Sequence, residues 1–313
     1  GWENEATVEA FKNYCQYVTE QLGDLMHYVC TINEANMGIQ VAAISARYRA
    51  QMMAKMQRMQ QGGAEEKKDL EGTAQVGMNF NDMMANMQKQ KEENVEIFGT
   101  DTLQTFVSAR TPEGDMLVIR AHQAARAAMK AVKPELQIGL TLSLHDIQAQ
   151  EGGEETAAKE WVDEFTHYVP YIKEDDFFGL QNYSRSLIGP NGILPVPEGA
   201  EITQMDYEYY PEGLEHVIRR VYEEMPMPIM VTENGIATAD DTRRVAYIQT
   251  AMKGVENCIQ DGIPVKGYMY WSMMDNFEWQ KGFGMTFGLI SVDRTTQTRT
   301  AKPSLTVLGN YTK

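Results

Sequence analysis

Three segments of the chain hold side chains that could act together on one substrate. Glu34 stands in TINEAN and Glu233 in VTENG, and each of them is next to an Asn and follows a short apolar run. The third segment, residues 267–304, holds carboxylates among aromatic residues: Tyr268, Tyr270, Trp271, Asp275, Asn276, Phe277, Glu278, Trp279 and Phe283. Aromatic faces beside carboxylates suit a sugar ring, because the faces stack on its C–H groups and the carboxylates accept from its hydroxyls.

A pair of carboxyl groups is what the hydrolysis of a glycosidic bond requires. One group protonates the leaving oxygen, and the other faces the sugar from the opposite side. When the second group attacks directly, the two lie about 5–5.5 Å apart and stereochemistry is retained. Glu34 and Glu233 are far apart in the sequence, so only a closed barrel could bring them together. Either string alone would indicate a surface carboxylate, and it is their combination with the aromatic segment that favours catalysis.

In this order the three segments resemble glycoside hydrolase family 1, the β-glucosidase family, over almost the whole chain. The resemblance implies a retaining β-glycosidase in which Glu34 is the acid/base and Glu233 the nucleophile. It implies further that Asn33 binds the 2-hydroxyl of the sugar, and that Tyr183, in GLQNYSR, donates to the nucleophile. The family usually has Pro after the acid/base, whereas this chain has Ala35, which removes a φ constraint but no reacting atom.

The same resemblance assigns residues to substrate binding. Gln181 would face the second sugar or aglycone, and Trp271 would form the platform under the ring. Glu278 would accept from the O4 and O6 hydroxyls, and Trp279 would cover the O3 side. A carboxylate at position 278 implies a neutral sugar, because it would repel the phosphate of a 6-phosphosugar. Core packing is the alternative role for the tryptophans, and an ordinary half-buried strand position is the alternative for Tyr183.

The amino-acid composition argues against several classes of binding partner. The net charge of −16 argues against nucleic acid and against anionic membrane surfaces, and no apolar run approaches the ~20 residues of a membrane span. Cys15, Cys30 and Cys258 have no CxxC spacing, so we expect neither a disulfide framework nor a zinc site, and a cytoplasmic location is favoured. We expect no metal and no cofactor, and a β-glucoside or related small saccharide as the partner.

Hydrophobic periodicity predicts the elements that must position these side chains. Helices are expected at 5–22, 37–60, 80–110, 113–132, 155–169, 211–225 and 241–260. Strands are expected at 26–32, 136–144, 177–180, 229–232 and 265–272. The Gly-rich residues 61–79 predict a break, and residues 184–210 a long loop. Pro211 is expected in the first turn of its helix and Asp241 at an N-cap.

This alternation, with polar candidates at the C-terminal ends of strands, predicts an α/β fold of the (β/α)8 TIM-barrel type. A doubly wound sheet would alternate in the same way, but its G-x-G-x-x-G fingerprint does not occur. No internal repeat or linker marks a second domain, so residues 1–313 are expected to form one barrel domain.

The resemblance also places the chain along the barrel. In the family the acid/base ends strand 4 and the nucleophile ends strand 7, and only one helix and part of a strand precede Glu34. We therefore expect the chain to correspond to strands 4 to 8, with the first three strand–helix units absent. Three explanations stay open: residues upstream of this numbering complete the barrel, a homo-oligomer or another chain closes it, or the remnant packs in a new way. The alternative function is a catalytically deficient barrel remnant that binds carbohydrate or stabilises an assembly, but the retention of the catalytic residues favours the enzyme.

Overall fold

The chain folds as two units in the computed structural model, which describes residues 1–47, 80–101, 103, 106, 108–279 and 281–311. The described part of the first unit lies within residues 1–47 and 80–138, and that of the second covers residues 139–279 and 281–311. The break expected at 61–79 lies outside the described residues. The expectation of a single barrel domain stays a prediction.

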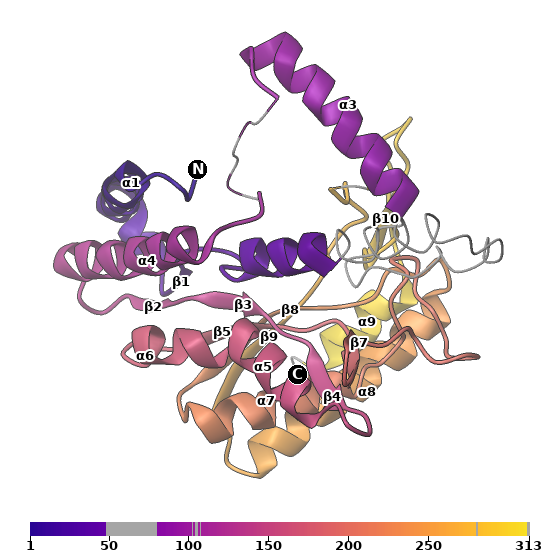
Figure 1. Ribbon diagram of the computed structural model, residues 1–313. Coiled ribbons are helices and arrows are strands. Elements are labelled where there is room, and N and C mark those ends of the chain that lie inside the picture. Colours follow the sequence, from indigo (N-terminus) through magenta and orange to yellow (C-terminus); the bar gives the residue numbers. More distant parts are fainter. Residues whose placement is uncertain (48–79, 102, 104–105, 107, 280, 312–313) are drawn as a thin grey trace. The chain divides into compact units, whose positions relative to one another are not determined.

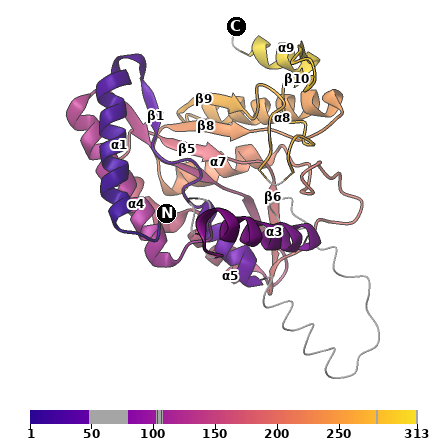
Figure 2. The same cartoon turned by 90° about the horizontal axis from the view of Figure 1, so that it is seen from above.

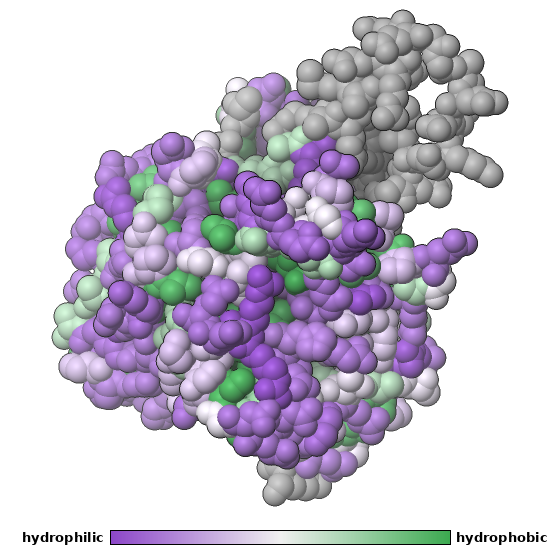
Figure 3. Space-filling model, turned by 60° about the horizontal axis from the view of Figure 1, so that its bottom comes forward, coloured by the Kyte–Doolittle hydropathy of each residue, from purple (hydrophilic) through white to green (hydrophobic). Residues whose placement is uncertain are grey.

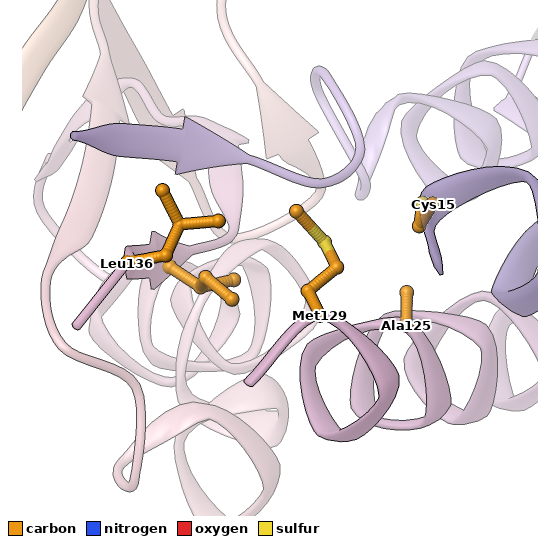
Figure 4. Packing of buried hydrophobic residues seen from close by; sticks show 5 residues of the cluster. Cys15, Ala125, Met129 and Leu136 are labelled. Carbon is orange, nitrogen blue, oxygen red and sulfur yellow. The ribbon is translucent and has the colours of Figure 1, made fainter. Parts of the chain in front are cut away.

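Two helices form the body of the first unit. α1 (Ala6–Leu22) packs along α4 (Pro112–Val132), close to the bounds that periodicity predicted. Below them β1 (Tyr28–Cys30) pairs with β2 (Gln137–Gly139). A buried cluster joins these elements (Figure 4). The partly buried Phe11, Met26 and Val29 pack against it. The cluster consists of Cys15, Ala125, Met129, Leu136 and Ile138. Burial in this cluster raises the pKa of the Cys15 thiol to about 11.

The remaining helices of the first unit follow their predicted positions in part. Residues 37–47 are helical, and the rest of the expected 37–60 helix lies outside the described residues. α3 (Phe80–Phe98) is shorter than the predicted 80–110. It ends where Gly99 adopts a φ of +72° and donates its N–H to the Val95 carbonyl at 3.1 Å. A glycine in this left-handed conformation commonly terminates a helix.

A four-stranded parallel sheet organises the second unit. Its order is β3 (Thr141–Ser143), β5 (Phe178–Gln181), β8 (Ile229–Asn234) and β9 (Val265–Tyr270), and Figure 2 shows β5, β8 and β9 side by side. The connecting segments contain α5 (Glu154–Glu164), α7 (Gly213–Glu224) and α8 (Asp241–Gln260) (Figure 1). α9 (Pro303–Asn310) packs on α8. The α/β class predicted from the alternation is confirmed.

Several strand predictions need correction. The run Leu136–Leu144 is not one strand, because β2 and β3 belong to different sheets on either side of Leu140. Gly139 lies so close to the neighbouring backbone that a Cβ there would be 2.2 Å from the Phe177 carbonyl oxygen. The predicted 184–210 loop contains β6 (Arg185–Gly189) and β7 (Gly192–Ile193), and β6 pairs with β4 (Asp146–Ala149). A hairpin of β10 (Ile290–Val292) and β11 (Arg299–Ala301) was also not predicted.

The helix boundaries differ in smaller ways. The predicted 155–169 helix breaks at Phe165 (φ −136°, ψ −59°), after which α6 (Val169–Ile172) forms. α7 begins two residues after Pro211, because Pro211 and Glu212 form a turn. The N-cap of α8 is Asp240 rather than Asp241, and its side chain accepts from the Thr242 N–H at 2.9 Å.

One face of the molecule is mostly polar (Figure 3). The face drawn in Figure 3 carries mostly hydrophilic side chains with single hydrophobic ones between them, as a chain of net charge −16 would. No helix among the described residues is both long enough and apolar enough to cross a membrane.

Candidate active site

The carboxylate of Glu233 is held by two neutral donors on the adjacent strand and its continuation. β8 places Glu233 opposite Gln181 on β5, in a parallel pairing. The Tyr183 hydroxyl donates to Oε2 of Glu233 at 2.6 Å, and Nε2 of Gln181 donates to Oε1 at 2.8 Å. Hydrogen bonds to both oxygens stabilise the ionised form and fix the orientation of a half-buried carboxylate. The structure therefore brings together three of the predicted site residues.

A buried network behind Glu233 supports this arrangement, and sequence reasoning did not predict it. The fully buried Asn234 donates from Nδ2 to the Asn182 carbonyl at 2.7 Å and to the Tyr247 hydroxyl at 3.0 Å. Its Oδ1 accepts from the Tyr268 hydroxyl at 2.8 Å. Tyr247 in turn donates to the Tyr183 carbonyl at 3.1 Å. Burial raises the pKa of Tyr247 and of Tyr268, so the hydroxyls of these two residues remain protonated donors.

Aromatic residues from distant segments meet beside Tyr183. Tyr183, Tyr207, Trp271 and Met285 pack against a buried cluster of Met205, Ala237 and Phe287. The ring centroids of Tyr183 and Phe287 are 6.2 Å apart in an edge-to-face arrangement. Trp271 can approach because Gly235 has no side chain: a Cβ there would lie 2.0 Å from the Trp271 carbonyl oxygen. The predicted sugar platform thus lies in the same cluster as the tyrosine that donates to Glu233.

The hydroxyl of Tyr207 is a further polar group in this region. It is buried and has no hydrogen-bond partner within the part of the chain that the structure describes. Burial is the main cause that raises the pKa of Tyr207 well above its usual value, with smaller contributions from Tyr247, Tyr270 and Glu278. Nothing in the sequence marks Tyr207 beyond its aromatic type.

Glu278 and Trp279 lie on a tight turn. The Glu278 N–H donates to the Gly282 carbonyl at 2.8 Å, and the Gly282 N–H returns a bond of 2.7 Å. Burial raises the pKa of the Glu278 carboxyl, and the bond that it accepts from the Trp279 N–H at 3.2 Å opposes this only in part. Trp279 is 81% exposed, so it does not pack in the core and its ring face is open.

Asp275 serves the structure of this segment. Its carboxylate accepts from the Gly288 N–H at 2.8 Å and from Nζ of Lys302 at 3.1 Å. The Lys302 ammonium also donates to the Gly288 carbonyl at 2.7 Å. Asp275 is thereby occupied in fastening the segment that carries Glu278 and Trp279 to the start of α9.

Asn33 and Glu34 belong to the first unit, in the turn after β1. Glu34 has a φ of +44°, which is uncommon for a residue with a side chain. Its carbonyl accepts from the Met37 N–H at 2.8 Å, while Ala35 and Asn36 are fully buried. Before the turn, Thr31 shares a hydrogen bond of 2.7 Å with Nδ1 of His122. The role predicted for Asn33 and Glu34 stays a prediction.

The histidines and acidic residues do not gather into a metal centre. Among the described residues, no three His, Cys, Asp or Glu side chains are arranged to hold a metal ion. His145 contacts Oε1 of Glu164 at 2.9 Å through Nδ1, and His167 contacts the Val162 carbonyl at 2.8 Å. These contacts are local and structural.

Known proteins resemble the chain in sequence and in fold. The model of the family described as "Glycosyl hydrolase family 1" matches residues 1–61 and 165–311. A 1,4-β-D-glucan glucohydrolase from Thermotoga neapolitana is 37% identical over 147 residues, which are 42% of this chain and 33% of the relative. The crystal structure of a β-glycosidase is 40% identical with a TM-score of 0.79, and the match covers 99% of this chain and 68% of that one. The ligand-free structure of a β-glucosidase is 34% identical with a TM-score of 0.80, and the match covers 99% of this chain and 69% of that one. The matched regions span between a third and a half of the length of the first curated relatives.

Proposed function

Because the chain belongs to glycosyl hydrolase family 1, we propose that it is a retaining β-glycosidase that hydrolyses terminal, neutral β-linked sugars by double displacement. The observation that carries this proposal is the Glu233 carboxylate, which accepts from Tyr183 at 2.6 Å and from Gln181 at 2.8 Å. A nucleophilic carboxylate must be ionised and correctly oriented, and two neutral donors supply both properties. The names of the β-glucosidase and glucan glucohydrolase relatives support a β-glucoside as the substrate.

In this mechanism Glu233 attacks the anomeric carbon and forms a covalent glycosyl-enzyme. The Glu34 carboxyl protonates the leaving oxygen, and its carboxylate then takes a proton from the water that releases the sugar. We expect the two carboxyl groups to lie about 5–5.5 Å apart in the working enzyme. Asn33 would bind the 2-hydroxyl, whose contacts strengthen as the transition state forms. Roles for Asn33 and Glu34 rest on the family's motif.

The sugar pocket follows from the aromatic segment. Trp271 would stack under the ring, and the open face of Trp279 would cover the O3 side. Glu278 would accept from O4 and O6, and its carboxylate would disfavour a 6-phosphosugar by charge repulsion. Gln181, which already donates to Glu233, would also border the second sugar or aglycone.

The barrel itself is part of the proposal. The chain would supply strands 4 to 8 of a (β/α)8 barrel, and three further strand–helix units would complete it, within a longer protein, a homo-oligomer or a separate chain. The 68% and 69% coverage of the two solved relatives supports this assignment. The free thiols of Cys15, Cys30 and Cys258 suit a reducing compartment such as the cytoplasm. The family match does not favour the non-catalytic remnant.

The test removes the nucleophile. We expect Glu233→Ala to lower turnover of an aryl β-glucoside by at least about a thousandfold, or ~4 kcal/mol in activation free energy. Azide should restore part of the turnover in this variant, and the product should be the α-glycosyl azide, because the small anion attacks from the side that the carboxylate vacates. The matched control is Glu198→Ala, at an exposed loop position. Full activity in Glu233→Ala would refute the proposed function.

A further inference from the structure

The turn that carries Glu34 has a backbone conformation that needs external support. The left-handed region is unfavourable for a non-glycine residue, and such strain persists only where neighbouring groups impose it. Glu34 has a φ of +44°, and the residue after it, Ala35, has no ring that would fix its own φ. Contacts from outside the turn can supply this support.

Arg110, far away in the sequence, supplies these contacts. Its Nη2 donates to the carbonyl of Ala35, directly after Glu34, and to Oδ1 of Asp115 at 3.1 Å. Its backbone N–H donates to the Gly38 carbonyl at 3.0 Å. A single residue thus holds both the beginning and the end of the segment from Ala35 to Gly38.

Arg110 is itself fixed by burial and charge. Arg110 and Asp115 are 7% and 3% exposed. Because water is largely excluded there, the charge of each residue is balanced by that of the other. Asp115 stands in the first turn of α4, where the helix dipole favours a negative charge. Gly38 provides the space, because a Cβ there would lie 2.6 Å from Nε of Arg110.

Taken together, these contacts lead to a role in catalysis. We propose that Arg110 is a positioning residue for the acid/base carboxyl of Glu34. The guanidinium, held by Asp115, fixes the Ala35 carbonyl and so fixes the direction in which the Glu34 side chain leaves the backbone. This inference rests on the proposed function, since it assigns Arg110 to the proton transfer that Glu34 performs.

The experiment compares two leaving groups, so that a loss of acid catalysis can be told apart from a general loss of activity. A 2,4-dinitrophenyl group departs without a proton, whereas a phenyl group needs one. Arg110→Lys keeps a positive charge beside Asp115 but lacks the planar fork that reaches two acceptors. We expect it to lower kcat/KM for phenyl β-glucoside by about a hundredfold, as a misplacement of about 1 Å would. For the dinitrophenyl substrate, kcat/KM should fall less than about threefold, because that step does not need the acid.

A second readout reports on the base. In Arg110→Lys, azide should raise kcat for the dinitrophenyl substrate and give the β-glycosyl azide, since it replaces the water that Glu34 no longer activates. Arg110→Met should show the same pattern more strongly if it folds. The control is Arg120→Met, which removes a surface ion pair between Arg120 on α4 and Glu5, the residue before α1. It should leave both substrates unchanged.

The outcomes separate the two proposals. An equal loss on both substrates in Arg110→Lys, or no loss on either, would overturn the positioning role. Failure of Arg110→Lys to fold, seen as loss of its circular dichroism, would also overturn it, because the arginine would then be structural. Glu34→Gln should show the same dependence on the leaving group with a larger amplitude. If Glu34→Gln shows none, the assignment of Glu34 in the proposed function is wrong rather than that of Arg110 alone.

Discussion

At the scale of single residues, the two proposed catalytic carboxyls are supported in different ways. Glu233 receives donors directly on its oxygens, from Tyr183 at 2.6 Å and Gln181 at 2.8 Å. The backbone beside Glu34 is held by Arg110, which donates to the following carbonyl, that of Ala35. Direct donors favour the ionised form that a nucleophile needs, and a fixed backbone sets the direction in which the Glu34 side chain leaves the chain.

Glu278 should weaken the fold at neutral pH. Burial raises the pKa of its carboxyl above the usual value for Glu, so the folded state binds the proton more tightly than the unfolded state. Its contribution to stability is therefore greatest below the unfolded pKa and declines as the pH rises through the folded pKa. We expect Glu278→Gln to unfold at a higher temperature than the parent at pH 7, with the difference shrinking toward pH 4. It should also bind a glucoside more weakly.

Thermal unfolding across this pH range would check the sign. Glu198→Gln, at an exposed loop position, is the matched control and should show no pH-dependent difference. A variant at 278 that is less stable than the parent at pH 7 would contradict the argument.

At the scale of elements, parallel strand order brings the site together. β5 ends at Gln181, β8 contains Glu233 and ends at Asn234, and β9 ends at Tyr270, directly before Trp271. Because these strands are parallel and adjacent, their C-terminal ends share one edge of the sheet. At this edge the backbone of Gly235 lies close to that of Trp271, and the Trp271 carbonyl occupies the space that a side chain on Gly235 would need.

Gly235→Ala should therefore damage both stability and activity. The new Cβ would lie 2.0 Å from the Trp271 carbonyl oxygen, so backbone must move. We expect a loss of about 2–3 kcal/mol in the free energy of unfolding, measured in urea, and a clear fall in turnover because Glu233 is two residues away. The control is Gly267→Ala on β9, whose Cβ would meet Met230 Cγ at an ordinary 3.7 Å. Equal stability of the two variants would show that the contact can relax.

Sequence reasoning found what local patterns encode and missed what tertiary contacts decide. Apolar runs located β5, β8 and β9, and the family's motifs paired Tyr183 with Glu233, whereas the bond from Gln181 to Glu233 was not predicted. Leu136–Leu144 is divided between two sheets, and Gly139 within it approaches the Phe177 backbone closely; hydrophobic periodicity indicates neither feature. The network from Asn234 through Tyr247 to Tyr183 joins β8, α8 and the end of β5, and nothing in α8 beyond one tyrosine indicates it.

At the scale of the whole molecule, the sheet of the second unit has two outer strands that bear on how the chain would associate. β9 is an outer strand: among the described residues it pairs with β8 alone, and β3 is the other outer strand. An open strand edge presents N–H and C=O groups that can pair with another chain. In the proposed barrel these edges would be covered by further strand–helix units, which would also supply one wall of the pocket.

Residues 1–313 expressed alone should therefore associate and turn over a chromogenic β-glucoside only weakly, because catalysis needs a preorganised pocket that restricts water. Light scattering should detect the association, and Met269→Lys, a charge at a half-exposed position of β9, should reduce it without restoring turnover. Adding an N-terminal segment of three strand–helix units from a family relative, in cis or as a separate chain, should restore a monodisperse barrel and its activity. A monodisperse monomer of the 313-residue span with the turnover of a complete β-glucosidase would show instead that the open edges are covered by the chain's own packing.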